Sequence, residues 1–389
     1  MKRNIRIGFL GCELFNNNLG CVALSYSLLS MLSEIQEENQ CIFEYYFFVR
    51  NRHGEVNLIR NILGIKNKIH VISCMDLESR DPFLRDRYFK HSLLECSLII
   101  DLTQGDSFTD IYGQERFDLW TKEKEWVLNH KIPLVIGPQT IGPFNASNNE
   151  ERAANILKKC IAVLPRDFIS YQYAEEISHR TDISLTCDLA FALPYHKIDG
   201  PKDFVGINVS GLLWKDGVEK TDKHFKYKCD YREFTYELIS FFTKINKNVV
   251  LIPHVLSDRY AMDEIHRSFP GTRVAEFFSD PIKAKEYISG LDFFVGARMH
   301  ATIAALSSGV AVLPVAYSRK FIGLYNTLEY PYVLDLTEKG TTEIIETAIE
   351  YYSKAEQIKH IIPNSLNISK ELLMVSKNRF SDIIKNLQG

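Results

Sequence analysis

The alternation of short apolar runs with longer segments of helical periodicity constrains the fold of this chain more than any other feature. Such runs, rich in Ile, Val, Phe and Leu, recur through the first half of the chain and again through the second. Continuous apolar runs separated by helix-length stretches are typical of a parallel sheet with helices on both faces. The runs lie at residues 5–10, 42–49, 68–74, 97–103, 133–140, 160–165, 182–188, 204–211, 248–254, 273–278, 292–297, 310–317 and 332–336.

Two of the helical segments are long. Residues 18–35 place Leu24, Leu28, Leu29 and Leu32 on one face, so we expect an amphipathic helix with Ser and Glu opposite. The tail from about 341 to 386 is also helical in pattern.

Length and one polar segment divide the chain into two predicted domains. With 389 residues, the chain exceeds what one hydrophobic core usually serves. Residues 194–203 read PYHKIDGPKD, and their prolines, glycine and mixed charges predict an exposed connection. We therefore expect an α/β protein with two tandem Rossmann-like domains, residues 1–195 and 204–389. The strands of both should open at their carboxyl ends onto an interdomain cleft.

Charge and cysteine content exclude several classes of partner and compartment. A net charge of −3, from 46 basic and 49 acidic residues, gives no general reason to bind nucleic acid or an anionic membrane. Eight cysteines without a C-x-x-C pair predict buried free thiols in a reducing compartment. The apolar run at the N-terminus is too short for a signal peptide, and no run of 18 apolar residues follows. A cytoplasmic location is expected.

The segment GARMHATIAALSSG, residues 296–309, carries the strongest functional signal. An apolar strand ends there at Arg298, and His300 lies at the start of a predicted helix over 300–308. Strand ends and helix starts at this sheet edge are where α/β proteins bind anions. Lys320 follows the next parallel strand and should return to the same edge. The alternative is that the two cations are solvated and the histidine is structural.

A family resemblance adds to this interpretation. The stretch GARMHATIAALSSGVAVLPVAYSRKF resembles the signature of the polysaccharide pyruvyl transferases, in which R-x-H opens a helix and Y-x-x-K follows the next strand. Members of that family are similar to two-domain GT-B-type enzymes that use phosphoenolpyruvate to place a pyruvate ketal across two hydroxyls of a sugar. Four further segments match in order: FNNNLGCVALSYSLL (15–29), IGPQTIGPF (136–144), LPRDFIS (164–170) and CDLAF (187–191).

The resemblance implies roles for four basic residues. It assigns Arg166, Arg298 and His300 to donor binding and chemistry, with Lys320 in support. Phosphoenolpyruvate carries a carboxylate and a phosphate, and arginine can donate two parallel hydrogen bonds to either. Ketal formation also needs a group that exchanges protons near pH 7, which indicates His300 as acid/base or as donor to the departing phosphate. The donor of the methylene proton stays open, with the carboxyl groups of Asp106, Asp188 and Asp258 as candidates.

The segment DLTQGDS, residues 101–107, supplies three candidates for substrate binding, Gln104, Gly105 and Asp106. It follows an apolar strand, and its glycine permits close backbone approach. The family usually has a more glycine-rich loop here, and a plain turn is the alternative interpretation.

Four more substrate-binding candidates have structural alternatives. Gln139 could contact the sugar or shape a Pro- and Gly-rich loop. Asn17 and Asn18 could bind an acceptor hydroxyl, although we expect at least one asparagine there to cap the following helix. His254 ends an apolar strand, where a structural hydrogen bond is the alternative. Lys215 is the nearest cation in a segment where family members often place an arginine, so a donor-binding role for that segment is doubtful.

Several activities lose support because their motifs are absent. The sequence has no G-x-x-x-x-G-K-[ST], no G-x-G-x-x-G after the first strand, no H-E-x-x-H and no zinc-type cysteine pairing. We predict no metal and no cofactor, with phosphoenolpyruvate as donor substrate and a sugar or lipid-linked oligosaccharide as acceptor. A lipid-linked acceptor would bring the enzyme to the inner membrane face, and the oligomeric state stays open.

Two alternative functions remain at this point. One is a GT-B nucleotide-sugar-dependent glycosyltransferase or epimerase, in which Arg298 and Lys320 would bind a diphosphate. The other is a non-catalytic protein that binds a glycan or a phosphate.

Overall fold

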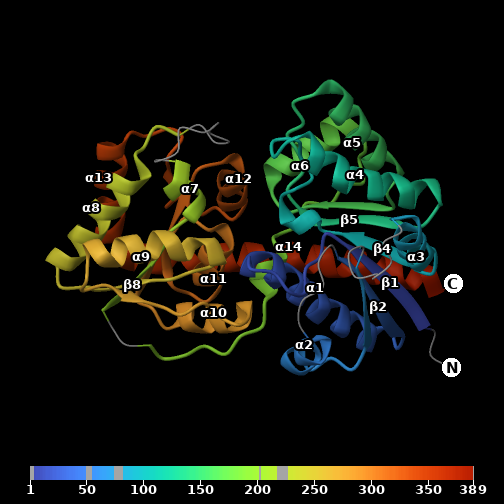
Figure 1. The fold of residues 1–389 in the computed structure, drawn as a ribbon, viewed down its shortest axis with the longest axis horizontal. Helices are drawn as coiled ribbons and strands as arrows, with labels where there is room; N and C mark the ends of the chain where they lie inside the picture. The colour runs from blue at the N-terminus through green and yellow to red at the C-terminus, as the bar shows by residue number, and fades with distance from the viewer. Residues whose placement is uncertain (1–3, 50–54, 74–81, 201–202, 217–226, 389) are drawn as a thin grey trace. The chain divides into compact units, whose positions relative to one another are not determined.

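The computed structural model describes residues 4–49, 55–73, 82–200, 203–216 and 227–388. Its chain forms two compact units, each built around a six-stranded parallel sheet with helices between the strands (Figure 1). This confirms the predicted α/β class with two Rossmann-like sheets. The N-terminal unit comprises Met1–Asn16, Leu24–Leu193 and Glu371–Gly389, and the C-terminal unit comprises Asn17–Ala23 and Pro194–Lys370.

The sheet of the N-terminal unit has the strand order β3-β2-β1-β4-β5-β6. Because the order reverses between β1 and β4, the carboxyl ends of these two strands form the switch point at which doubly wound sheets bind ligands. Figure 1 shows α4, α5 and α6 on one side of this sheet and α1 and α2 on the other. The strands are β1 (Asn4–Leu10), β2 (Ile42–Val49), β3 (Lys68–Ser73), β4 (Leu98–Asp101), β5 (Leu134–Gln139) and β6 (Ala162–Pro165). The helices are α1 (Leu19–Glu38), α2 (Val56–Leu63), α3 (Pro82–Leu94), α4 (Gln114–Asn129), α5 (Ser147–Lys159) and α6 (Phe168–Ser178), with short 3₁₀ turns η1 (Thr103–Gly105) and η2 (Leu189–Ala192).

The sheet of the C-terminal unit has the order β12-β11-β10-β7-β8-β9, so its switch point lies between β7 and β10. Helix α8 packs against α13, and α10 packs against α11. The strands are β7 (Phe204–Asn208), β8 (Asn248–Leu251), β9 (Arg273–Val274), β10 (Phe293–Gly296), β11 (Ala311–Ala316) and β12 (Leu334–Asp335). The helices are α7 (Gly211–Asp216), α8 (Tyr231–Lys244), α9 (Arg259–Ser268), α10 (Pro281–Ser289), α11 (Met299–Ser307), α12 (Arg319–Thr327), α13 (Thr341–Ser353) and α14 (Ala355–Gln388), with the 3₁₀ turn η3 (Leu256–Asp258).

Helix α1 is buried on more of its circumference than the sequence pattern predicts. Leu28 and Leu32 are buried as expected, but so are Ser25 and Ser27, although serine was expected on the face opposite the leucines. By length and hydropathy alone α1 could cross a membrane, yet 78% of the apolar window is buried within the fold, as in a core helix. The serines therefore line the interior instead of a polar face.

One predicted strand is absent, and another is shorter than expected. Residues 182–188 run beside β6 and donate only two backbone hydrogen bonds to it, from Ser184 to Val163 (3.2 Å) and from Thr186 to Pro165 (2.9 Å). Two bonds do not make a ladder, and apolar content alone could not reveal this. In the C-terminal unit, β9 keeps only two of the six residues predicted at 273–278.

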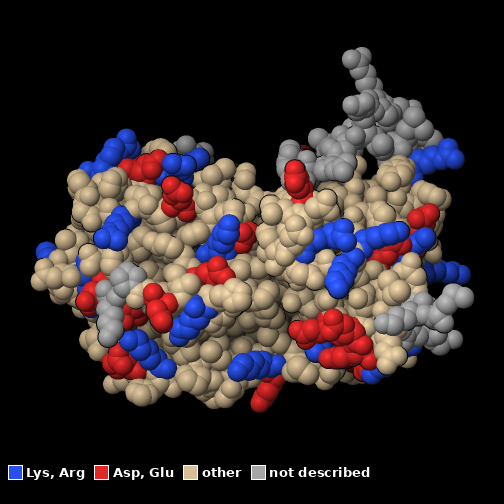
Figure 2. Space-filling model, turned by 90° about the horizontal axis from the view of Figure 1, so that it is seen from below, with Lys and Arg blue, Asp and Glu red and all other residues tan. Residues whose placement is uncertain are grey.

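The cysteines and the surface charges follow the sequence-based expectations. The seven cysteines within the described residues are free and buried, whereas Cys74 lies outside those residues. On the face shown in Figure 2, Lys and Arg side chains alternate with Asp and Glu, so this face carries no extended field of one sign.

Candidate functional site

Arg298 lies at the switch point of the C-terminal unit, directly after β10 and before α11. Its backbone N–H donates to Oδ1 of Asn208 at the end of β7 (2.8 Å). The guanidinium donates from Nε and Nη2 to Oδ1 of Asp258, at 3.1 and 2.6 Å. Burial opposes the charge of this group, but the Asp258 carboxylate outweighs burial and raises the pKa of Arg298. The arginine is thus fixed in position and remains charged.

Asp258 connects three segments of the C-terminal unit. Besides Arg298, its carboxylate accepts from the backbone N–H groups of Gly211 (2.9 Å) and Val255 (2.9 Å). The side chain is fully buried. Because every one of these contacts uses the carboxylate as an acceptor, the geometry makes Asp258 the partner that orients Arg298.

His300 lies in the first turn of α11 and packs against the start of α1. A Cβ atom on Gly20 would come within 2.6 Å of Cγ of the His300 ring. Only glycine therefore fits at position 20 while the imidazole keeps its place. The first turn of α11 also offers a helix N-terminus beside Arg298, which favours a bound anion.

His254 follows β8 and is buried in the C-terminal unit, near His300 and Arg298. Within the part of the chain that the structure describes, neither ring nitrogen has a hydrogen-bond partner. Burial, reinforced by the charges of His300 and Arg298, lowers the pKa of His254 to about 3. At neutral pH the ring is therefore an uncharged imidazole with one donor and one acceptor unused, and such groups are uncommon in protein interiors.

The asparagines before α1 belong to the same surroundings. The Asn18 side chain accepts from the Gly20 N–H (3.1 Å), which confirms the expectation that an asparagine caps this helix. The exposed Asn17 accepts from the N–H of Leu256 through its backbone carbonyl (2.9 Å), and His254 accepts from the N–H of Leu19 (3.1 Å). The start of α1 is thus bonded to the segment that carries His254.

Lys320 lies in the first turn of α12, after β11. Its ammonium nitrogen lies 5.7 Å from the centre of the Tyr317 ring. Tyr317 is buried and interacts electrostatically with Arg298. Tyr317 is therefore a neighbour of both Lys320 and Arg298.

Arg166 is the corresponding basic residue of the N-terminal unit, where it follows β6. The side chain is fully buried and donates from Nη1 to Oδ2 of Asp188 (2.6 Å) and from Nε to Oγ1 of Thr140 (3.0 Å). Asp188 also accepts from the N–H of Ala190 and so caps η2. Like Arg298, Arg166 is held by a buried aspartate.

Gly105 allows the loop after β4 to approach Arg166. Its φ is +89°, and a Cβ there would lie 3.1 Å from Nη1 of Arg166 and 2.7 Å from Leu24. Thr103 and Gln104 also have positive φ, at 40° and 54°. Three consecutive left-handed residues indicate a strained loop that the surrounding structure holds in place.

A buried network supports this loop from below. Lys124 pairs with Asp101 at 3.0 Å and donates to Thr103 at 2.7 Å, and all three side chains are fully buried. The amide nitrogen of Gln139 donates to the side chain and the backbone carbonyl of Asp101, both at 2.9 Å. The structure therefore places Gln139 within this network.

Gln104 and Asp106 lie at the more exposed edge of the loop. Gln104 donates to Glu13 (3.1 Å) and accepts from Arg116 (2.9 Å). Asp106 accepts from the hydroxyl of Tyr112 (3.0 Å). This edge presents carboxylate, amide and guanidinium groups together, a set that can bind sugar hydroxyls.

The structure thus groups the predicted residues into two sets. Arg298, His300, His254 and the start of α1 come together in the C-terminal unit, and Arg166 with Gly105 in the N-terminal unit. The sequence did not indicate three residues that hold or neighbour the predicted ones, namely Asn208, Tyr317 and Lys124. Lys215 is exposed. Among the described residues, no group of three or more His, Cys, Asp or Glu could hold a metal ion.

Comparison with known families identifies the group to which the protein belongs. The model of the polysaccharide pyruvyl transferases matches residues 18–319, about three-quarters of the chain, and includes both arginines and His300. The chain belongs to the polysaccharide pyruvyl transferase family. Comparison with curated protein sequences gives no significant match. Membership makes the protein a transferase of polysaccharide biosynthesis.

Solved structures with a similar fold are GT-B-type proteins of low sequence identity. S. aureus MnaA, solved with UDP, has a TM-score of 0.63 at 11% identity, covering 99% of this chain and 96% of that chain. The UDP-GlcNAc 2-epimerase of Neisseria meningitidis, bound to UDP-GlcNAc, has a TM-score of 0.60 at 10% identity, covering 97% and 99%. A putative UDP-N-acetylglucosamine 2-epimerase of Listeria monocytogenes has a TM-score of 0.62 at 9% identity, covering 98% of both. These similarities support the GT-B-type fold.

Proposed function

We propose that this member of the family transfers pyruvate from phosphoenolpyruvate to two hydroxyls of a hexose in a cell-surface polysaccharide precursor, forming a pyruvate ketal. The observation that carries the proposal is the R-x-H pair, Arg298 and His300, at the switch point of the C-terminal sheet. The family match over residues 18–319 supports the same activity.

Arg298 is suited to bind an anionic donor. Its Nε and Nη2 bond to Asp258, and Nη1 makes no hydrogen bond to any described residue. Because the guanidinium is already held in one position, it would lose no further side-chain entropy on binding an anion. It also lies beside the N-terminus of α11, which favours a negative charge. In the N-terminal unit Arg166 is held likewise by Asp188, and we assign it to the donor as well.

The reaction balances with two hydroxyls and one donor. A proton adds to the methylene carbon of phosphoenolpyruvate, and one sugar hydroxyl forms a bond to the adjacent carbon. The bond from this carbon to the phosphate oxygen breaks, and the second hydroxyl closes the ketal. Inorganic phosphate leaves, and the two hydroxyl protons balance the proton delivered to carbon and the one taken by phosphate. His300 is the proposed acid/base, or the donor to the departing phosphate.

Further residues of each unit are assigned to the substrates. As an uncharged imidazole, His254 can donate to and accept from a substrate oxygen without adding charge. Gln104 and Asp106, with Asn17 and Asn18, are assigned to acceptor hydroxyls, and Lys320 to support of the donor. The acceptor is a sugar or a lipid-linked oligosaccharide, and we place the enzyme in the cytoplasm, at the inner membrane face when the acceptor is lipid-linked.

A second candidate is a nucleotide-sugar-dependent epimerase or glycosyltransferase. The specific observation in its favour is that two of the structures with similar folds were solved with UDP or UDP-GlcNAc. At sequence identities of 10–11%, these similarities are evidence for the fold but not for the activity. The family match therefore favours pyruvyl transfer over the second candidate.

A binding experiment separates the two candidates. Phosphoenolpyruvate should raise the melting temperature of the protein, whereas UDP-GlcNAc should not. Mass spectrometry of acceptors incubated with phosphoenolpyruvate should then detect the ketal with the wild type and not with His300→Ala. His360→Ala, an exposed histidine on α14, serves as the control. Stabilisation by UDP-GlcNAc alone would overturn the proposal.

A further inference from the structure

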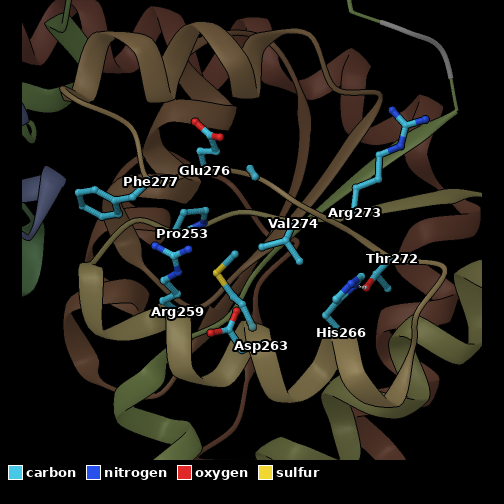
Figure 3. Close-up of a pocket in the computed structure, with 11 residues that line it drawn as sticks. Pro253, Arg259, Asp263, His266, Thr272, Arg273, Val274, Glu276 and Phe277 are labelled. Carbon is cyan, nitrogen blue, oxygen red and sulfur yellow. Dashed lines mark hydrogen bonds between the residues drawn. The ribbon is translucent and has the colours of Figure 1, made fainter.

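A cavity of the C-terminal unit lies between α9, strand β9 and the residues that follow β8 and β9 (Figure 3). Its volume is about 630 Å³, within the range of roughly 300–1,000 Å³ that small-molecule sites occupy. In the order β10-β7-β8-β9 the cavity lies one to two strands out from the switch point.

The cavity and the proposed reaction site share one short segment of chain. Pro253 and Arg259 line the cavity, whereas His254 and Asp258, their immediate neighbours, face Arg298 and His300. A substrate with one part at Arg298 could therefore place another part in the cavity by passing this segment.

The lining combines an apolar floor with charged groups of both signs. Val274 lies at its centre in Figure 3, with Phe277 at one end, and Met262 is a further apolar residue of the lining. Arg259, Asp263 and Glu276 supply one cationic and two anionic groups. The second arginine, Arg273, points away in Figure 3 and stacks on the Phe204 ring at 4.6 Å.

This lining disfavours a phosphate and favours a sugar ring. A phosphate would face two carboxylates with one arginine to compensate. A sugar ring carries no charge, and its C–H face packs on apolar and aromatic side chains. Its hydroxyls can donate to the carboxylates and accept from the guanidinium, so that the anionic and the cationic side chains of the lining both gain hydrogen-bond partners.

We propose that the cavity lined by Arg259, Asp263, Glu276 and Phe277 binds a sugar ring of the acceptor substrate other than the one that receives the ketal. The proposal rests on the proposed function and names a second contact for its acceptor. The shared chemistry is a polyhydroxylated ring, which could be a further glycosyl unit or the ribose of a nucleoside.

Saturation-transfer difference NMR on the full chain tests the proposal, because it detects weak binding. The probes are lactose and cellobiose for a glycosyl unit and uridine for a ribose. We expect ring protons of at least one of the two disaccharides to be saturated by the wild type, and the signal to fall at least fivefold in Phe277→Ala and in Glu276→Gln. Arg267→Ala, on the same helix but outside the lining, should keep the wild-type signal.

The outcomes are distinct from those of the pyruvyl-transfer experiment. Signals from a disaccharide identify a glycan source and support the acceptor-ring site if the variants abolish them, whereas signals from the uridine ribose alone identify a nucleoside source and would overturn it. Absence of signal for all three probes, or signals that the two variants leave unchanged, would overturn it. Stabilisation of the wild type by phosphoenolpyruvate is measured separately, so its failure would count against the proposed function alone.

Discussion

The buried pair of Arg298 and Asp258 decides the geometry of the switch point at the level of single residues. Replacing Asp258 with Ala would leave the arginine without its counter-charge and three backbone N–H groups without an acceptor. Breaking a buried pair from one side costs about 3–5 kcal/mol, so we expect Asp258→Ala to lower the free energy of unfolding by that order.

Urea denaturation measures this loss. The double variant Asp258→Ala/Arg298→Met removes the stranded charge and should recover part of the stability. A single variant within about 1 kcal/mol of the wild type would show that the pair carries little of the local order.

His254 should make stability depend on pH. Its pKa is lowered from the ordinary 6.5 to about 3 by burial and by the nearby charges of His300 and Arg298. Below pH 6.5 the imidazole of His254 is protonated in the unfolded chain but stays uncharged in the folded chain. The contribution is therefore complete above pH 6.5 and is lost as the pH falls toward about 3, at up to about 1.4 kcal/mol per pH unit.

Comparing unfolding free energies at pH 7.5 and 5.5 checks this. The free energy of unfolding should fall between pH 7.5 and pH 5.5 by about 1 kcal/mol less in His254→Asn than in the wild type. The exposed His360→Ala should keep the wild-type drop. Equal drops in wild type and His254→Asn would contradict a low pKa.

At the level of elements, the loop of η1 depends on one glycine. Gly105 has a positive φ and lies against Arg166, so Gly105→Ala adds both backbone strain and a steric clash. Gly113 also has a positive φ, +95°, but a Cβ there would meet nothing within 4 Å. Gly113→Ala should thus lower the free energy of unfolding through backbone strain alone, by about 1 kcal/mol. Gly105→Ala should lower it by about 1–3 kcal/mol more, because the steric clash adds to the strain.

Thermal unfolding with and without phosphoenolpyruvate separates strain from function. Gly105→Ala should weaken stabilisation by phosphoenolpyruvate because it displaces Arg166, whereas Gly113→Ala should leave it intact. The assignment of Arg166 to the donor fails if both variants respond as the wild type does.

The elements also show what a single sequence can predict. Strands such as Ile42–Val49 were predicted within a residue, because an uninterrupted apolar run is a local signal. The pairing of Arg298 with Asp258 was not predicted, because the two residues lie 40 positions apart and only the tertiary fold brings them together. Asp258 was accordingly considered as a proton donor, although its contacts are those of an acceptor. The burial of Ser25 and Ser27 escaped prediction for the same reason, because local polarity does not report what packs against a helix.

At the scale of the whole molecule, the C-terminal unit is not continuous in sequence. Residues Asn17–Ala23 belong to it, although 170 residues of the other unit follow them before it resumes at Pro194. They accept from Leu256, donate to His254 and supply the glycine beside His300. The predicted domain 204–389 therefore omits part of the structure that holds the proposed catalytic histidine.

A fragment experiment follows from this arrangement. Residues 194–389 expressed alone should not be stabilised by phosphoenolpyruvate, because the backbone partners of His254 and the surface against His300 are missing. The fragment should also show weaker amide-exchange protection over residues 252–258 than the full chain, since that segment loses its bonds to Asn17 and Leu19. If the fragment shows the same protection and the same stabilisation, the N-terminal segment would be dispensable, and the donor site would have to be built from the later residues alone.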